Sequence, residues 1–208
     1  MGIMPINHPA IKSISLHEMI MKKLLYVALA LLFAVIMINY KSLMQYSISE
    51  QKINQALQRQ NNYQKQIGLP GLLDAQITLS QLKSQIGHTA PNEIQLTANA
   101  KVVIGSLLGS QNADITLTLK TQPLFDGDKG AIFLKEITLT DYVVQPEQMG
   151  SAIKMLIPYL NQSLKLYFNQ QPVYVLNADK STAEAIAKKL AKGLEVKPGE
   201  LIISFVKK

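Results

Sequence analysis

Few residues of this chain could do chemistry. Of its three histidines, His8 and His17 precede an apolar run, which leaves His88 alone in the remainder. A lone histidine beside Thr89-Ala90-Pro91 builds neither a metal cluster nor a Ser-His-Asp triad, and we expect it to be a loop residue. The sequence has no cysteine, which excludes disulfides, thiolate metal sites and thiol nucleophiles.

Two short motifs also fail as chemical sites. Asp126-Gly127-Asp128-Lys129-Gly130 lacks the ligand spacing of a calcium loop and is expected to be a solvated turn. The stretch 105–110 has no Gly-Lys-Ser/Thr and predicts a connection between strands. No base accompanies any serine, so a lipid hydrolase is disfavoured. We therefore predict a non-enzyme with no catalytic residue, no metal and no cofactor.

The charge narrows the choice of partners. The formal net charge is +7, and it is +5 without Lys12, Lys22, Lys23 and Glu18 near the N-terminus. This mild basic excess favours an anionic membrane surface. Nucleic-acid binding would require clustered basic residues with stacking aromatics, whereas Arg59 is the only arginine and tryptophan is absent. We predict no nucleic-acid partner.

One uncharged apolar run, from Leu24 to Ile38, follows Lys22-Lys23. It is either an export signal or an anchor, and the absence of a small-x-small cleavage site behind it favours an uncleaved transmembrane signal-anchor over 21–40. Residues 1–20 are expected to be an unstructured or mis-annotated extension. Two lysines before the run against Lys41 behind it predict a single-pass membrane protein with its N-terminus inside and the domain 41–208 outside.

That domain reads as a short helix, alternating strands, a long helix and a mixed tail. Ser47 and Glu50, or alternatively Ser49 with an Ile48–Ile53 staple, mark the start of the first helix. Period-two alternation at 94–104 and 115–119 predicts antiparallel strands with one buried face, and a change of phase between Leu134 and Ile137 indicates a bulge.

The long helix is expected to run from Pro146 to about Asn169. Apolar residues recur along it at steps of three and four, which predicts a continuous buried stripe. Beyond it we expect a strand over 173–176, a helix with a Ser181–Glu184 capping box and Gly193 as C-cap, and a final strand over 201–206.

Several longer segments resemble the YceB-like bacterial lipoproteins, the DUF1439 family. The resemblance extends roughly over 43–205 and is carried by 67–71, 84–87, 129–136, 158–162, 167–176 and 187–200. It implies export to the periplasm, no enzymatic activity, and an α+β fold similar to the tubular lipid-binding (TULIP) proteins, with a strongly curved antiparallel sheet wrapped around the long helix. The lipobox cysteine of such lipoproteins is missing, because the corresponding stretch reads Ile38-Asn39-Tyr40-Lys41. Lipidation is therefore not expected. Together with the export that the resemblance implies, the apolar run then predicts a single-pass protein of the bacterial inner membrane, with the domain 41–208 facing the periplasm.

With this resemblance, the apolar stripes predict a hydrophobic ligand, a lipid or fatty acyl chain, in a channel between sheet and helix. The candidate lining residues are Leu96, Ile115, Leu117, Phe133, Ile153, Leu156, Leu160, Leu164 and Phe168. The alternative is a structural or interaction protein of the cell envelope, in which the same residues are plain core and no ligand is bound.

Overall fold

The structure is a computed structural model that describes residues 16–59, 63–69, 73–106, 109–179 and 181–206. The chain divides into two compact units, Met1–Leu43 and Met44–Lys208. Each unit is described by itself.

The first unit contains helix α1, Leu16–Leu43. Residues 1–15 of the predicted extension lie outside the described residues. Among the residues that the structure describes, no helix combines the length with the apolar character that a bilayer crossing requires. The predicted transmembrane signal-anchor over 21–40 is therefore wrong. The uncharged run from Leu24 to Ile38 spans only about 22 Å as a helix, short of a hydrocarbon core of about 30 Å.

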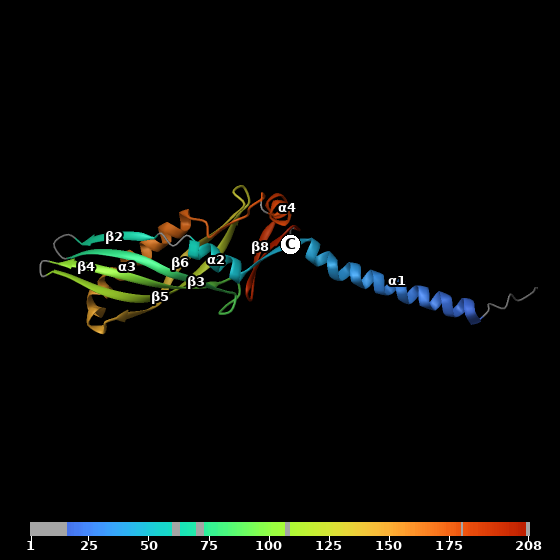
Figure 1. The fold of residues 1–208 in the computed structure, drawn as a ribbon, viewed down its shortest axis with the longest axis horizontal. Helices are drawn as coiled ribbons and strands as arrows, with labels where there is room; N and C mark the ends of the chain where they lie inside the picture. Colours follow the sequence, from blue (N-terminus) through green and yellow to red (C-terminus); the bar gives the residue numbers. More distant parts are fainter. Residues whose placement is uncertain (1–15, 60–62, 70–72, 107–108, 180, 207–208) are drawn as a thin grey trace, which may run out of the picture. The chain divides into compact units, whose positions relative to one another are not determined.

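The second unit is built on a six-stranded sheet in the order β2-β3-β4-β5-β6-β7, in which every neighbouring pair is antiparallel (Figure 1). Its strands are β2 (Gln64–Leu69), β3 (Leu73–Ile86), β4 (Ile94–Ser106), β5 (Gly109–Asp126), β6 (Ala131–Gln145) and β7 (Tyr174–Val175). From β2 to β6, each strand pairs with the strand that follows it in the sequence. Short hairpin turns are therefore sufficient to connect them.

Bulges interrupt two of the long strands. The predicted change of phase in β6 is confirmed, because the register between β5 and β6 shifts around Glu136, whose φ is 54°. A second bulge, which the sequence did not predict, lies in β3 between Ser80 and Lys83, where Gln81 has a φ of 52°. Such bulges bend a strand and re-aim its side chains.

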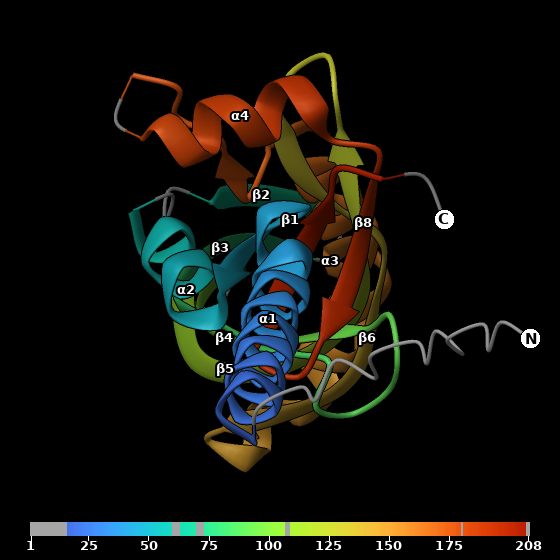
Figure 2. The same ribbon diagram turned by 90° about the vertical axis from the view of Figure 1, so that its right-hand side faces the viewer.

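A separate three-stranded sheet has the order β1-β9-β8 and comprises β1 (Gln45–Ser49), β8 (Gly193–Lys197) and β9 (Glu200–Ser204). Of these strands only β9 was predicted. Gly193, expected to cap a helix, instead begins β8. Helix α4 (Thr182–Leu190) ends earlier and lies against β1 (Figure 2).

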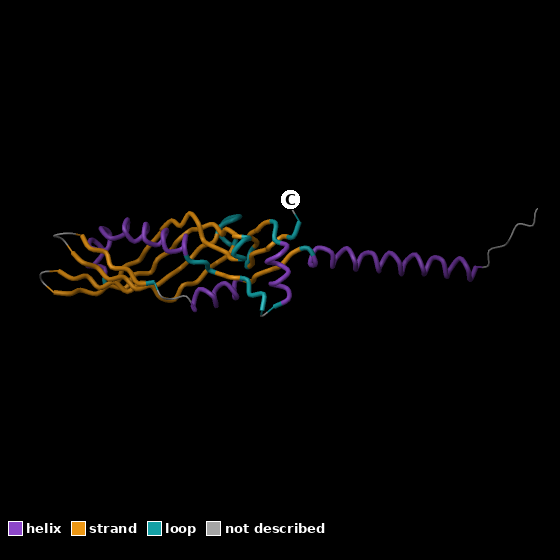
Figure 3. The backbone as a smooth tube through the Cα atoms, turned by 90° about the horizontal axis from the view of Figure 1, so that it is seen from above, coloured by secondary structure: helices purple, strands orange, loops and turns teal. Residues whose placement is uncertain are grey.

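Two further helices pack on the large sheet. Helix α2 (Glu50–Arg59) packs on β3, and the Ser49 hydroxyl accepts a hydrogen bond from Lys52 N at 3.4 Å, which makes Ser49 its cap. A 3₁₀ turn, η1 (Glu147–Met149), precedes α3 (Gly150–Gln170), which contacts β6 and β2. Figure 3 shows the helices of this unit beside its long strands.

The predicted fold class is wrong as a whole. The protein is mostly sheet, and its strands form two separate sheets rather than one sheet around a helix. The predicted N-terminal transmembrane helix is contradicted, and the two sheets differ from the single wrapped sheet expected of a TULIP-like arrangement. The physical reason lies in long-range pairing: β1 and β9 are about 150 residues apart in sequence, and no local pattern reports that they meet.

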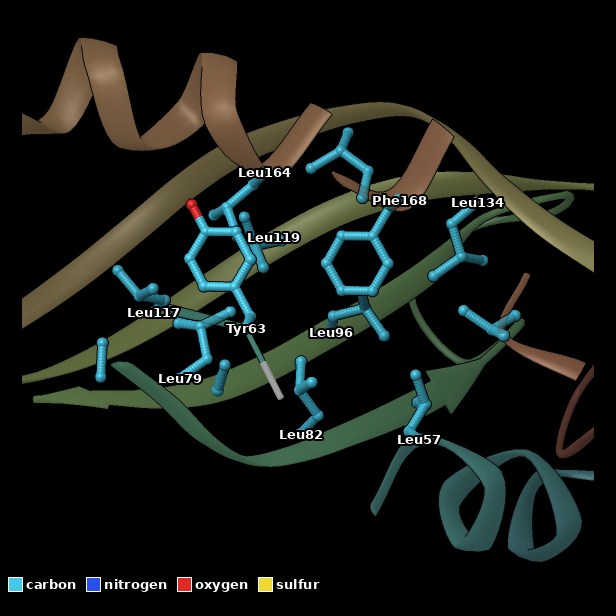
Figure 4. Packing of buried hydrophobic residues seen from close by; sticks show 14 of the residues in the cluster. Leu57, Tyr63, Leu79, Leu82, Leu96, Leu117, Leu119, Leu134, Leu164 and Phe168 are labelled. Atoms are coloured by element: carbon cyan, nitrogen blue, oxygen red, sulfur yellow. The ribbon is translucent and has the colours of Figure 1, made fainter. Parts of the chain in front are cut away.

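The core lies between α3 and the six-stranded sheet. The buried stripe of α3 belongs to one apolar cluster with the inward-facing residues of β3, β4 and β5. The stripe consists of Ile153, Leu156, Leu160, Leu164 and Phe168. Figure 4 shows Leu164 and Phe168 pointing from α3 toward Leu96, Leu117 and Leu119 of the sheet.

Two leucines of α3 test this packing. Leu164 is completely buried, whereas Leu166 is 57 % exposed. We expect Leu164→Ala to lower the free energy of unfolding by about 2–5 kcal/mol, because it leaves a cavity in the core. Leu166→Ala should change it by less than about 0.5 kcal/mol. Denaturant melts of both variants measure the difference, and equal destabilisation would contradict this orientation of α3.

Candidate functional site

The predicted lining residues of α3 share one buried face. Ile153, Leu156, Leu160, Leu164 and Phe168 are each at most 2 % exposed, and all belong to the main apolar cluster. Their steps of three and four residues keep them in line along the helix. The helix side of the candidate site is therefore brought together as one wall.

Three predicted residues of the sheet form the opposite wall. Leu96 of β4 and Ile115 and Leu117 of β5 belong to the same cluster as the α3 stripe. Leu96 pairs with Leu119, which extends the wall along β5. Alternation places these side chains on the face that α3 covers, because every second residue of a strand points the same way.

Phe133 is not brought to this interior. It is buried but lies outside the main cluster, to which its neighbours Ile132 and Leu134 belong. Phe133 therefore points to the other face of β6. There the ammonium groups of Lys129 and Lys135 lie 5.1 and 5.3 Å from its ring centroid. These distances are typical of cation–π contacts.

A hollow of about 220 Å³ opens between the start of β2 and the last turns of α3. Its lining residues are Tyr63, Gln64, Lys65, Ser163, Leu166, Tyr167 and Gln170. None of them was predicted as a site residue. Tyr63 could have been noticed as the one aromatic in the polar stretch 58–66, but its partner on α3 is 104 residues away and only the fold reveals it.

Two tyrosines of the hollow are also part of the core. Tyr63 is 4 % exposed and belongs to the main cluster, while Tyr167 is half-buried and packs against it. The rings of Tyr63 and Tyr167 meet edge to face with centroids 5.1 Å apart, and Tyr167 makes the same contact with Phe168. Two of the side chains that line the hollow are therefore also in, or packed against, the apolar core.

The Tyr63 hydroxyl is buried and has no hydrogen-bond partner of normal geometry among the residues that the structure describes. Burial raises the pKa of Tyr63, and the nearby Ser163 side chain opposes this increase without cancelling it. A buried hydroxyl that lacks a partner is costly, because it has given up its hydrogen bonds to water. Among the polar groups that line the hollow, the Tyr63 hydroxyl is thus a buried one that could bond an incoming ligand.

A second cluster of polar groups centres on Glu184 of α4, which is 7 % exposed. Its Oε1 accepts hydrogen bonds from the hydroxyls of Tyr46 (2.9 Å) and Tyr174 (2.8 Å), and its Oε2 accepts one from Asn177 N (2.5 Å). Tyr46 lies on β1 and Tyr174 on β7, so one carboxylate joins the two sheets. We call this cluster the Glu184 junction.

The capping box predicted here is only half present. Ser181 caps α4 by accepting a hydrogen bond from Glu184 N, but the Glu184 carboxylate turns to the junction instead of the cap. The sequence identified both residues and missed the role of the carboxylate. The signal for that role, two tyrosines 128 residues apart, becomes visible only when both sheets are in place.

The hydrogen bonds of the junction set its charge state. Burial raises the pKa of Glu184, but the bonds from Asn177 N, Tyr174 and Tyr46, together with the charge of Lys52, outweigh it and leave the pKa below its ordinary value. Burial and the Glu184 hydrogen bond raise the pKa of Tyr174 to about 12. The junction is therefore a carboxylate held by two neutral phenols.

The other candidates for chemistry have simple structural partners. His88 Nε2 lies 3.2 Å from a Glu50 carboxylate oxygen, and that oxygen also accepts a hydrogen bond from Ile86 N. Asp126 accepts a hydrogen bond from Lys129 N within the turn between β5 and β6. Within the described residues no three His, Cys, Asp or Glu side chains are grouped as a metal site would require.

Comparison with known proteins identifies relatives. A family model described as "Protein of unknown function (DUF1439)" matches residues 48–200. The protein named "Uncharacterized lipoprotein YceB" from Salmonella typhimurium is 54 % identical over 185 residues, which cover 89 % of this chain and 99 % of that protein. The protein of the same name from Escherichia coli K12 matches with the same identity and coverage. Neither the family description nor these names mention a catalytic activity.

The names of the relatives bear on the predicted attachment. Proteins named as lipoproteins conflict with a single-pass inner-membrane protein held by an N-terminal transmembrane anchor. Together with the finding on the described helices, they overturn the predicted anchor, the membrane partner that it implied and the inner-membrane localisation.

The Glu184 junction yields a pH-dependent prediction. A folded-state pKa below the unfolded value means that the stabilisation is present above the unfolded pKa of about 4.3 and is lost as pH falls through the folded pKa. We expect Glu184→Gln to cost about 1–3 kcal/mol at neutral pH, because hydrogen bonds to a charged group are lost. This difference from the wild type should shrink as pH falls below about 4.

Denaturant melts between pH 7 and pH 3 measure this difference. Glu147→Gln, at an exposed carboxylate of η1, is the matched control and should change little at either pH. A deficit of Glu184→Gln that stays constant down to pH 3 would show that the junction does not work through its charge.

Proposed function

We propose that this chain, which belongs to the DUF1439 family, is a non-catalytic protein of the cell envelope that binds an apolar ligand, a lipid or fatty acyl chain, between α3 and the six-stranded sheet. The hollow between β2 and α3 is the entrance. The observation that carries the proposal is that Tyr63 and Tyr167 line this hollow and at the same time pack in or against the apolar core.

The envelope assignment rests on relatives. They are named lipoproteins and match the chain over most of its length. Attachment by acylated cysteine is not part of the proposal, because the 208 residues contain no cysteine.

An acyl chain suits the chemistry of the interior. The side chains that α3 and the sheet bring together are aliphatic or aromatic, and an acyl chain gains about 0.8 kcal/mol for each methylene that it buries there. The hollow, at about 220 Å³, is smaller than the roughly 300 Å³ of a typical small-molecule pocket. A single narrow chain fits this size better than a ring system does, and an outward turn of the half-buried Tyr167 ring would admit more of it.

The rim provides groups for the polar end of such a ligand. Lys65 is exposed at the edge of the hollow, and an anionic head group placed there would meet its charge. The unpartnered Tyr63 hydroxyl lies deeper and offers a hydrogen bond to a carbonyl or hydroxyl on the chain. The apolar tail would then point toward Phe168 and the core.

One observation favours a second candidate function. The stripe of α3 and the wall of the sheet are almost completely buried by one another, which is also the signature of a closed core. In that case the protein is a structural or interaction protein of the envelope without a ligand, and the hollow is a surface depression.

Neighbouring positions on α3 distinguish the two functions. Ser163 lines the hollow, whereas Gln162 is exposed and does not. Titration with a fluorescent polyene fatty acid should show saturable binding to the wild type. Ser163→Trp should weaken it by roughly 10-fold or more, because the indole fills the entrance, and Gln162→Trp should leave it within about twofold.

Both variants keep the same α1, so any binding by that helix is common to all three proteins. Denaturant melts verify that both variants remain folded. Absence of saturable binding by the wild type would support the closed core, and equal loss in both variants would remove the hollow as entrance.

A further inference from the structure

Helix α3 has a second apolar stripe, which faces away from the sheet. Met155, Tyr159 and Leu166 are 49, 48 and 57 % exposed. Spacings of four and seven residues place them in one line, about 16 Å long from Met155 to Leu166. We call these three residues the outer stripe. A helix that packs against a sheet on one side normally turns charged or polar residues outward, so three large apolar side chains in line need a partner.

Lysines border the outer stripe on one side. Lys154 and Lys165 are both exposed and, eleven residues apart, lie on the same side of the helix. Neither makes an ion pair with a residue that the structure describes. Helix α3 contains no Asp or Glu, and the first acidic residue before it is Glu147 in η1. The charged residues on the outward side of α3 are thus all cationic, and they border the apolar outer stripe.

We infer that this face of α3 docks onto an anionic lipid surface. In such docking, the apolar residues of a helix that lies parallel to the surface enter the boundary between head groups and acyl chains. Lysines beside them extend along the surface and contact the anionic head groups. The proposal rests on the exposure and charge of α3 and does not depend on the apolar ligand proposed above, although Leu166 also lines the hollow.

Charge complementarity selects a lipid surface over a second copy of the chain. Two copies that met through this face would bring their Lys154 and Lys165 side chains together without an acidic residue of α3 to offset them. An anionic bilayer can bury the apolar outer stripe and offset the charges of both lysines. The net charge of +7 acts in the same direction over longer distances.

The absence of cysteine allows a local measurement on the full chain. A single cysteine introduced as Tyr159→Cys carries a polarity-sensitive fluorophore, and Val143→Cys, at a position 55 % exposed on β6, carries the same fluorophore as the matched control. The probes are vesicles of phosphatidylcholine, with or without about one-third phosphatidylglycerol. The label at 159 should shift to the blue with the anionic vesicles only, and the label at 143 should stay in water.

Charge variants on the Tyr159→Cys background test the role of the lysines. Lys154→Gln with Lys165→Gln should lower the partition coefficient roughly 30-fold, and Lys83→Gln with Lys101→Gln, at exposed lysines of β3 and β4, should lower it less than about threefold. Raising the salt from about 0.1 to 1 M should release the label, because screening shortens from about 10 to 3 Å.

Four results would overturn the proposal. The label at 159 would remain in water with anionic vesicles, or would shift no more than the label at 143. The shift would be independent of lipid charge and of Lys154 and Lys165. Finally, a shift that grows with protein concentration in the absence of vesicles would assign the outer stripe to a second copy of the chain.

Discussion

The burial of one stripe of α3 against the six-stranded sheet is the constraint on which the rest of the domain depends. Because Leu164 and Phe168 must face the sheet, the opposite side of the helix is turned to solvent together with Leu166. The same orientation brings Tyr167 to the edge of the sheet, where it meets Tyr63 beside β2. The apolar core, the hollow and the outer stripe are therefore three consequences of one helix orientation.

Two sets of contacts hold the small sheet in place relative to the large one. At one, the Glu184 carboxylate accepts hydrogen bonds from Tyr46 and Tyr174, which belong to different sheets. At the other, Gly87 approaches the backbone of Lys197 so closely that a Cβ would lie 2.9 Å from it, and its φ of 65° also suits glycine. Neither set contacts the hollow, so the connection of the sheets and the proposed binding use different residues.

The residues of the candidate site could be predicted where the spacing of apolar residues along a helix or strand shows which face is buried. They could not be predicted where such a spacing is absent. The stripe of α3 and the alternation of β4 and β5 were predicted, because their spacing shows which face is buried. The sequence prediction placed Phe133 on the face of β6 that points to the interior, whereas its side chain points to the other face. Residues 131–134 are all apolar, so no alternation shows which of them face the interior. Tyr63 was missed because it stands alone in a polar stretch.

The sequence by itself determined the absence of cysteine chemistry, the family resemblance, the long strands with the β6 bulge, and the apolar face of α3. These are local properties, set by residue type and by spacing within a few residues. Only the tertiary structure decided that the strands form two sheets, that Glu184 joins them, and that Tyr63 and Tyr167 flank a hollow. Each of these requires contact between residues about 100 or more positions apart, and such contacts depend on how whole elements pack.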